Sequence, residues 1–149
     1  MKILLALITV SSLLFSNVNQ KVVLITGTAL GIGKSTALHL IEKGHIVYGG
    51  DILIEENLYL NESGGFALEM DVTKQEHIDA AISKIIEEQG RIDVLVNNAG
   101  VADFGNLEET DFKRWNEVMK TNLNGVFLCS QKAIIHLKKT NGNIVNIAS

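Results

Sequence analysis

Three glycines within residues 27–33 have the spacing of a loop that holds a phosphate group. Gly27, Gly31 and Gly33 lie between a short apolar run, residues 22–25, and a helical pattern. Glycine permits a tight turn and lets a ligand approach the backbone closely. A helix that begins at such a turn points its unpaired N–H groups and the positive end of its dipole at the ligand. The segment therefore predicts a binding site for a phosphate or pyrophosphate.

Two kinds of nucleotide site compete for this loop. A P-loop has the pattern G-x-x-x-x-G-K-[ST], and Gly33-Lys34-Ser35 supplies its end, but residue 28, where the first glycine belongs, is threonine. A dinucleotide site needs an acidic residue about 20 positions further on, at the end of a second strand. Asp51 follows the apolar stretch 46–50 and meets that requirement, since its carboxylate would accept hydrogen bonds from a ribose. We therefore favour a dinucleotide site and keep a P-loop nucleotide hydrolase as an alternative.

Further motifs follow the glycine loop in a fixed order. The pattern T-G-x-x-x-G-x-G spans residues 26–33, and after it come Asp71-Val72, the N-N-A-G sequence at 97–100, and Asn122 within T-N-L-N-G. The tail, residues 142–149, has the pattern of a fifth strand followed by Ser149. In these motifs residues 21–149 resemble the short-chain dehydrogenase/reductase family.

The resemblance implies a site for a nicotinamide dinucleotide. Asp51 would bind the adenosine ribose, while the carboxylate of Asp71 and the backbone of Val72 would lie beside the adenine. Leu30 occupies a position that is often basic in NADP-dependent members, and Asp51 would repel a 2′-phosphate, so we expect NAD rather than NADP. The residues expected to contact the cofactor are Gly27, Thr28, Ala29, Leu30, Gly31, Ile32, Gly33, Asp51, Asp71, Val72, Asn98, Ala99 and Gly100.

The resemblance also implies two catalytic residues. Asn122 would hold a water molecule in the proton relay, and Ser149 would hydrogen-bond the carbonyl or hydroxyl group of a small-molecule substrate. In the family a Tyr-x-x-x-Lys pair beyond the serine completes proton transfer, and the sequence contains no such pair. We therefore expect the N-terminal portion of an NAD(P)-dependent oxidoreductase, without turnover on its own because the acid–base residue is missing. A non-catalytic dinucleotide-binding module is the second interpretation.

Alternating strands and helices must position these residues. The pattern predicts an α/β fold, a Rossmann-like doubly wound parallel sheet with strand order 3-2-1-4-5, in which the C-terminal strands of the family are missing. Gly125 would lie inside a helix, which suggests close packing or a close ligand. We expect Thr110 or Asp111 to cap that helix, 110–139. In a family-like homo-oligomer, the same helix would form the contact between copies. The strands are expected near 22–25, 45–50, 66–70, 92–96 and 144–147, and the helices near 32–44, 52–61, 74–89 and 110–139.

Residues 1–20 differ in character from the dinucleotide-binding domain at 21–149. Lys2 precedes the mostly apolar residues 3–15 and then a polar stretch, which is the outline of a secretory signal peptide. The apolar part is short for a membrane span, which needs about 20 residues. We expect a signal peptide, with an uncleaved N-terminal anchor and a gene-model artefact or extra element as alternatives. If the segment acts as a signal, the chain enters the secretory pathway or associates with a membrane; otherwise it is cytoplasmic.

Composition and charge exclude several classes of function. The net charge is −4 and no basic cluster interleaved with aromatic residues is present, so nucleic acid is not an expected partner. The single cysteine, Cys129, excludes an internal disulfide framework and a cysteine-rich metal site. The four histidines are not paired at helical spacing, and we assign no metal.

Overall fold

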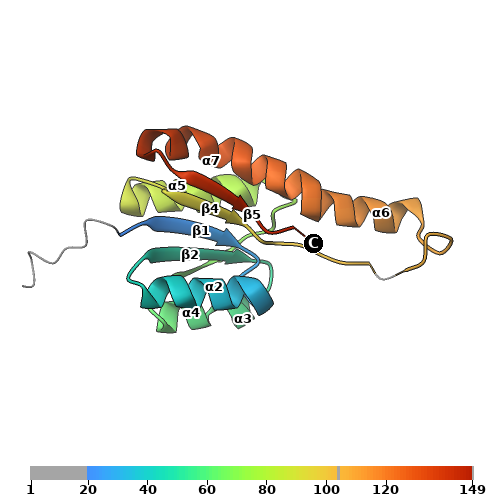
Figure 1. Cartoon of the computed structure of the whole chain (residues 1–149), viewed down its shortest axis with the longest axis horizontal. Coiled ribbons are helices and arrows are strands. Elements are labelled where there is room, and N and C mark those ends of the chain that lie inside the picture. Colours follow the sequence, from blue (N-terminus) through green and yellow to red (C-terminus); the bar gives the residue numbers. More distant parts are fainter. Residues whose placement is uncertain (1–19, 104, 149) are drawn as a thin grey trace, which may run out of the picture.

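The computed structural model describes residues 20–103 and 105–148, and in them a single parallel sheet forms the centre of the protein (Figure 1). Its order is β3-β2-β1-β4-β5, which confirms the predicted Rossmann-like topology. The first 19 residues of the expected signal segment and the expected catalytic Ser149 lie outside the described residues. The strands are β1 (Val22–Thr26), β2 (Ile46–Asp51), β3 (Phe66–Glu69), β4 (Val94–Asn97) and β5 (Asn143–Asn146).

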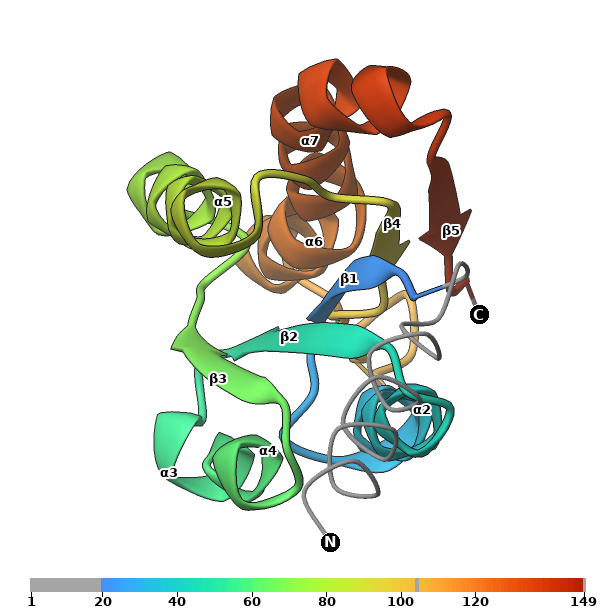
Figure 2. The same cartoon turned by 90° about the vertical axis from the view of Figure 1, so that its left-hand side faces the viewer.

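Helices cover both faces of the sheet, as the end-on view in Figure 2 shows. One face carries α2 (Gly31–Glu42), α3 (Ile54–Asn57) and α4 (Tyr59–Glu62), and the opposite face carries α5 (Gln75–Gln89) and α7 (Val126–Thr140). The single helix expected at 52–61 is thus two short helices. In the described part of the chain no helix is long and apolar enough to cross a bilayer.

Alternate residues of β1 belong to two separate hydrophobic cores. Val22 and Leu24 pack with side chains of α5 and α7, whereas Val23 and Ile25 pack on the other face with α2 and α4. Every residue of β1 is buried. This is why the strand is a continuous apolar run, as expected for a parallel strand covered on both faces.

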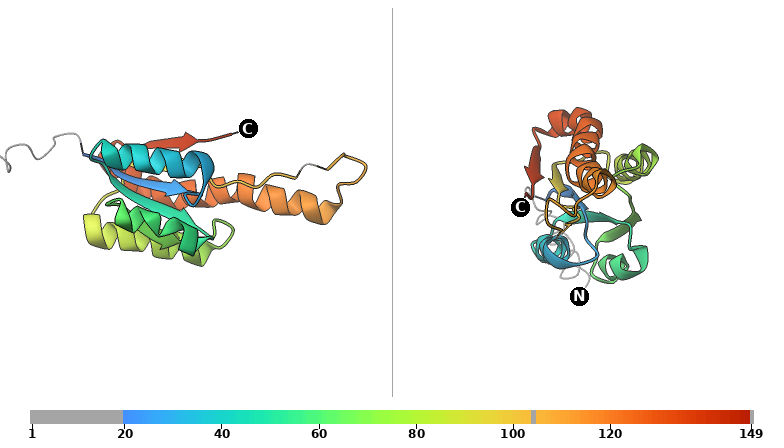
Figure 3. Two further views of the ribbon diagram at one scale, coloured as in Figure 1. Left: turned by 90° about the horizontal axis from the view of Figure 1, so that it is seen from below. Right: turned by 90° about the vertical axis from the view of Figure 1, so that its right-hand side faces the viewer.

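The long helix expected at 110–139 consists of three consecutive segments. After α6 (Phe112–Met119) comes the π-helical segment η1 (Lys120–Gly125), which leads into α7. Asp111 caps α6 as predicted, because its carboxylate accepts a hydrogen bond from the backbone N–H of Arg114 at 2.8 Å. A Cβ on Gly125 would lie 2.8 Å from Cγ2 of Val72, so close packing accounts for this glycine. Figures 1 and 3 show that α6 projects beyond the sheet.

Tyr48 of β2 is a buried phenol with two polar partners on α5. Its hydroxyl donates to Oε2 of Glu88 at 2.6 Å and accepts from Nε2 of Gln89 at 3.0 Å. The ring stacks on Phe66, with 4.5 Å between the ring centroids. Burial, together with the hydrogen bond to the Glu88 carboxylate, raises the pKa of Tyr48 to about 12.

This raised pKa predicts a specific loss of stability in alkaline solution. The pKa of Tyr48 is about 12 in the folded protein against an ordinary 10.0. The stability contributed by the neutral phenol is therefore complete below pH 10 and is lost as the pH rises from 10 to 12. We expect the free energy of unfolding of Tyr48→Phe, measured by urea denaturation, to fall less steeply over this range than that of the wild type. Tyr59 is present in both proteins and cancels, so equal slopes would contradict the assignment.

Candidate functional site

The glycine turn lies where β1 ends and α2 begins. Gly27 and Gly31 have φ values of 73° and 58°, which glycine adopts readily. A Cβ on Gly33 would lie only 2.0 Å from the carbonyl oxygen of Gly27, so α2 contacts the turn directly. No side chain caps α2 at Leu30 and no acidic residue lies in its first turn. The first N–H groups of α2 and the positive end of its dipole are thus left for an anionic ligand.

The end of β4 fixes the other side of this turn. The hydroxyl oxygen of Thr26 accepts hydrogen bonds from the backbone N–H groups of Asn98 and Ala99, both at 3.0 Å. The side-chain amide of Asn98 donates to the carbonyl oxygens of Thr26 and Gly27 at 2.9 and 2.8 Å. Asn98 therefore supports the turn with its side chain. Thr26 is the first residue of the T-G-x-x-x-G-x-G pattern, but we did not expect it to be a site residue. Its position at the end of a buried strand, directly before the turn, was the signal for this supporting role.

The structure places Asp51 beside the same turn. Its Oδ2 accepts a hydrogen bond from the backbone N–H of Ala29 at 2.8 Å, and its Oδ1 accepts one from Leu53 at 2.9 Å. Each carboxylate oxygen keeps a further lone pair for a ligand hydroxyl group. Leu30 of the turn is exposed, as are Ile52 and Leu53 directly after Asp51. Ile52 and Leu53 are not among the residues that we expected near the cofactor, although the sequence shows two apolar residues directly after Asp51.

Not every residue of the turn faces outward. Thr28 is completely buried, and its hydroxyl donates to Oδ1 of Asn57 at 2.8 Å. The hydroxyl of Tyr59 donates to the carbonyl oxygen of Thr28 at 2.8 Å. Burial, followed by the charge of Asp51, raises the pKa of Tyr59 to about 12. The side chain of Thr28 therefore faces the protein interior, and only its backbone borders the turn.

Lys34 does not lie where a P-loop lysine would lie. Its Nζ is 4.3 Å from the centroid of the Tyr59 ring, a cation–π contact on the side of α2 that faces α4. The lysine of a P-loop reaches the phosphates of its nucleotide. The position of Lys34 thus does not support the P-loop alternative.

Asp71 and Val72 follow β3. Burial opposes ionisation of Asp71, but hydrogen bonds from the hydroxyl and backbone N–H of Thr73, with the charges of Lys74 and His77, outweigh it and hold the pKa of Asp71 below its ordinary value. The side chain of Val72 is buried. Asp71 therefore carries an ionised carboxylate shortly after β3, while the side chain of Val72 packs in the protein interior.

Asn122 lies in the π-helical segment η1 and holds the loop that follows β4. Its Oδ1 accepts a hydrogen bond from the backbone N–H of Val101 at 2.9 Å, and its Nδ2 donates to the carbonyl oxygen of Val101 at 2.8 Å. One amide hydrogen and one oxygen lone pair of Asn122 remain for another partner. π-Helical turns within α-helices occur frequently at functional sites.

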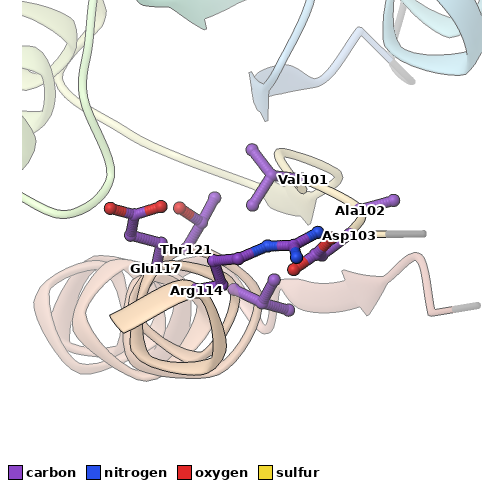
Figure 4. Close-up of a pocket in the computed structure, with 7 residues that line it drawn as sticks. Val101, Ala102, Asp103, Arg114, Glu117 and Thr121 are labelled. Atoms are coloured by element: carbon purple, nitrogen blue, oxygen red, sulfur yellow. Dashed lines mark hydrogen bonds and ion pairs between the residues drawn. The ribbon is translucent and has the colours of Figure 1, made fainter. Parts of the chain in front are cut away.

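A cavity of about 380 Å³ opens between this loop and the helix (Figure 4). Within it the guanidinium group of Arg114 points at the carboxylate of Asp103 and forms an ion pair with it. Arg114 therefore does not offer a free positive charge. The cavity is lined by Val101, Ala102, Asp103, Arg114, Glu117, Val118 and Thr121.

In the described part of the chain no group of three or more His, Cys, Asp or Glu side chains is placed to hold a metal ion.

Comparison with known proteins identifies relatives along most of the chain. A family model described as short chain dehydrogenase matches residues 21–149. The 3-oxoacyl-[acyl-carrier-protein] reductase FabG of Thermotoga maritima is 40% identical over 137 residues, which cover 87% of this chain and 55% of the relative. The chain thus spans about half the length of the curated relatives it matches.

Two solved structures share the fold. A 3-ketoacyl-(acyl-carrier-protein) reductase from Brucella melitensis, complexed with NADH, has a TM-score of 0.83 and 30% identity, and the match covers 87% of this chain and 57% of that one. An alcohol dehydrogenase from the archaeon Thermococcus sibiricus, complexed with 5-hydroxy-NADP, has a TM-score of 0.82 and 30% identity, with coverages of 86% and 57%. Since the family model matches all of the chain beyond its first 20 residues, the protein belongs to the short-chain dehydrogenase family.

Proposed function

We propose that this chain forms the dinucleotide-binding region of an NAD-dependent oxidoreductase that acts on a small alcohol or carbonyl compound. The observation that carries the proposal is the arrangement of Asp51 against the glycine turn, at an uncapped helix N-terminus. The carboxylate is placed for ribose hydroxyl groups, and the helix N-terminus is placed for a pyrophosphate. Both lie at the carboxyl edge of the sheet, where ligands of this fold class bind.

The residues around the turn fit such a cofactor. Gly31 has open space where a Cβ would stand, so a ligand can approach its backbone. The bound nicotinamide would accept or supply a hydride. The chain's own groups would bind and orient: the N–H groups at the start of α2 bind the pyrophosphate, and Asp51 binds the ribose.

Two residues are proposed for the reacting end of the site. Asn122 would use its remaining amide hydrogen or lone pair to hold a water molecule, and Ser149 would hydrogen-bond the oxygen atom of the substrate. Neither is a useful base at neutral pH, so their role is to orient a proton path. The bonds between Asn122 and Val101 support this role, because they fix Asn122 next to the loop that leaves β4.

The charges near Asp51 support NAD rather than NADP. Asp51 is an acidic residue at the place where a 2′-phosphate would add negative charge, and Leu30 beside it is uncharged and exposed. Lys34, one helical turn further on, contacts the ring of Tyr59. One of the two relatives of known structure was solved with NADH and the other with 5-hydroxy-NADP, so the shared fold alone does not decide between the two cofactors.

A second copy of the chain is the proposed partner of the helix α6–η1–α7. Large apolar side chains lie exposed along it, among them Phe112 at 77% and Phe127 at 60% exposure, with Trp115 and Leu123 between them. An exposed apolar stripe of this length usually marks an interaction surface. Two copies related by a twofold axis would bury the same stripe on each.

Cofactor binding tests the proposed function directly. We expect isothermal titration to show NADH binding to the 149-residue chain and no binding of ATP–Mg²⁺. Gly33→Ala should abolish NADH binding, because the new Cβ would meet the carbonyl oxygen of Gly27 at 2.0 Å. Gly105→Ala is the matched control, since the three atoms nearest its Cβ would all belong to the guanidinium group of Arg114, at 2.9 to 3.3 Å. Binding of ATP–Mg²⁺ without NADH would refute the proposal.

Asp51 should decide between the two cofactors. Loss of a hydrogen bond to a charged group costs about 1.5–3 kcal/mol, so Asp51→Ala should weaken NADH binding by roughly 10- to 100-fold. The same change should strengthen NADPH binding, because it removes the repulsion of the 2′-phosphate. Asp79→Ala changes the net charge equally on α5, where Asp79 pairs with Lys132, and should alter neither affinity. A wild-type chain that binds NADPH more tightly than NADH would show that this role of Asp51 is wrong.

The proposed dimer should depend on the exposed apolar stripe. Phe127→Glu places a charge at one end of the stripe, so we expect sedimentation equilibrium to show a monomer where the wild type is a dimer. Ser83→Glu adds the same charge to an exposed position on α5 and should leave the dimer intact. A wild type that is monomeric at all concentrations tested would contradict the proposed partner.

A further inference from the structure

A buried polar cluster joins the glycine turn to the segment that follows β2. It consists of Thr28 from the turn, Gly49 from β2 and Asn57 from α3. We infer that Asn57 is a positioning residue for the dinucleotide site: by holding Thr28, it fixes the turn and the ribose-binding carboxylate of Asp51. The inference rests on the proposed function and adds to it a residue that does not touch the cofactor.

The bonds of Asn57 satisfy both ends of its side-chain amide. Its Oδ1 accepts a hydrogen bond from the hydroxyl of Thr28 at 2.8 Å, and its Nδ2 donates to the carbonyl oxygen of Gly49 at 2.8 Å. Asn57 and Thr28 are both completely buried. A buried polar group that loses its partner keeps the cost of desolvation, so the two side chains depend on one another.

The chain makes room for this pair at Gly49. A Cβ there would lie 2.4 Å from the Thr28 hydroxyl and 2.2 Å from Cδ1 of Leu60. Because Gly49 has no side chain, the threonine hydroxyl enters the interior between β2 and the two short helices. The glycine in the middle of a strand is thus explained by the close approach of Thr28.

The position of Thr28 sets the position of the ligand-binding groups. The next residue, Ala29, donates its backbone N–H to Asp51, and the hydroxyl of Tyr59 binds the carbonyl oxygen of Thr28. Asn57 thus holds the side chain of Thr28 and Tyr59 holds its backbone. If the contact with Asn57 is lost, Ala29 moves relative to Asp51 and the ribose site loses its geometry.

Cofactor affinity in matched variants tests this inference. Asn57→Leu should weaken NADH binding to the 149-residue chain by about 10-fold, which corresponds to the free energy of roughly one hydrogen bond. Asn61→Ala is the control: Oδ1 of Asn61 accepts a hydrogen bond from the backbone of Ala67 at 2.8 Å, away from the turn. It should lower stability without changing NADH affinity, which separates positioning from a general structural effect.

Thr28 supplies a second pair of variants in case Asn57→Leu does not fold. Thr28→Val keeps the shape of the side chain but leaves Oδ1 of Asn57 without a donor, so it should weaken NADH binding in the same way. Thr28→Ser keeps the hydroxyl and should retain the wild-type affinity. Unchanged affinity in both Asn57→Leu and Thr28→Val, in a wild type that binds NADH, would overturn the inference.

Amide hydrogen exchange of the free chain decides the question without the cofactor. The N–H groups of Ala29 and Leu53 are both bonded to Asp51 and report on the geometry of the ribose site. We expect both to exchange at least several-fold faster in Asn57→Leu or Thr28→Val and at the wild-type rate in Asn61→Ala. Unchanged exchange in the first two variants would overturn the inference. A wild type that fails to bind NADH refutes the proposed function alone, because the exchange rates still show whether Asn57 positions the turn.

Discussion

The contact between the start of α2 and the glycine turn is the constraint on which the site depends. Because Gly33 has no side chain, the helix lies directly against the carbonyl group of Gly27. The carbonyl groups of Thr26 and Gly27 in this turn accept their hydrogen bonds from within the protein. The amide of Asn98 supplies the missing donors to Thr26 and Gly27. A turn that presents its N–H groups to a ligand thus needs a donor from a neighbouring strand for its carbonyl groups.

Two strands other than β1 complete the arrangement from opposite sides. On one side Asn98 directly follows β4, and on the other β2 ends at Asp51 and is followed by Asn57 and Tyr59. These contacts exist because β1 lies between β2 and β4 in the sheet. The order 3-2-1-4-5 therefore does more than bury apolar surface, since it places two sets of polar side chains on either side of one turn.

The π-helical segment η1 combines packing and function in a few residues. At its end Gly125 packs against Val72, and within it Asn122 bonds to Val101. One helix thereby contacts both the segment that follows β3 and the loop that follows β4. The departure from regular α-helix directs Asn122 toward the loop while α7 keeps its packing on the sheet.

The sequence by itself determined the fold class, the strand order and the place of the turn. Apolar runs such as 22–25, the glycine spacing and the cap at Asp111 are local features, and local backbone preferences fix them. It also pointed to Asp51, because this acidic residue ends the second strand about 20 positions after the glycine turn, where a dinucleotide site needs one. The tertiary structure decided which partners those residues have. That Thr28 faces Asn57, that Asn98 supports the turn, and that the helix after residue 110 contains a π-helical segment follow from contacts between residues 21 to 72 positions apart. Such contacts depend on which side chain fills a given space between packed elements, and the spacing of residues along the chain does not contain that information.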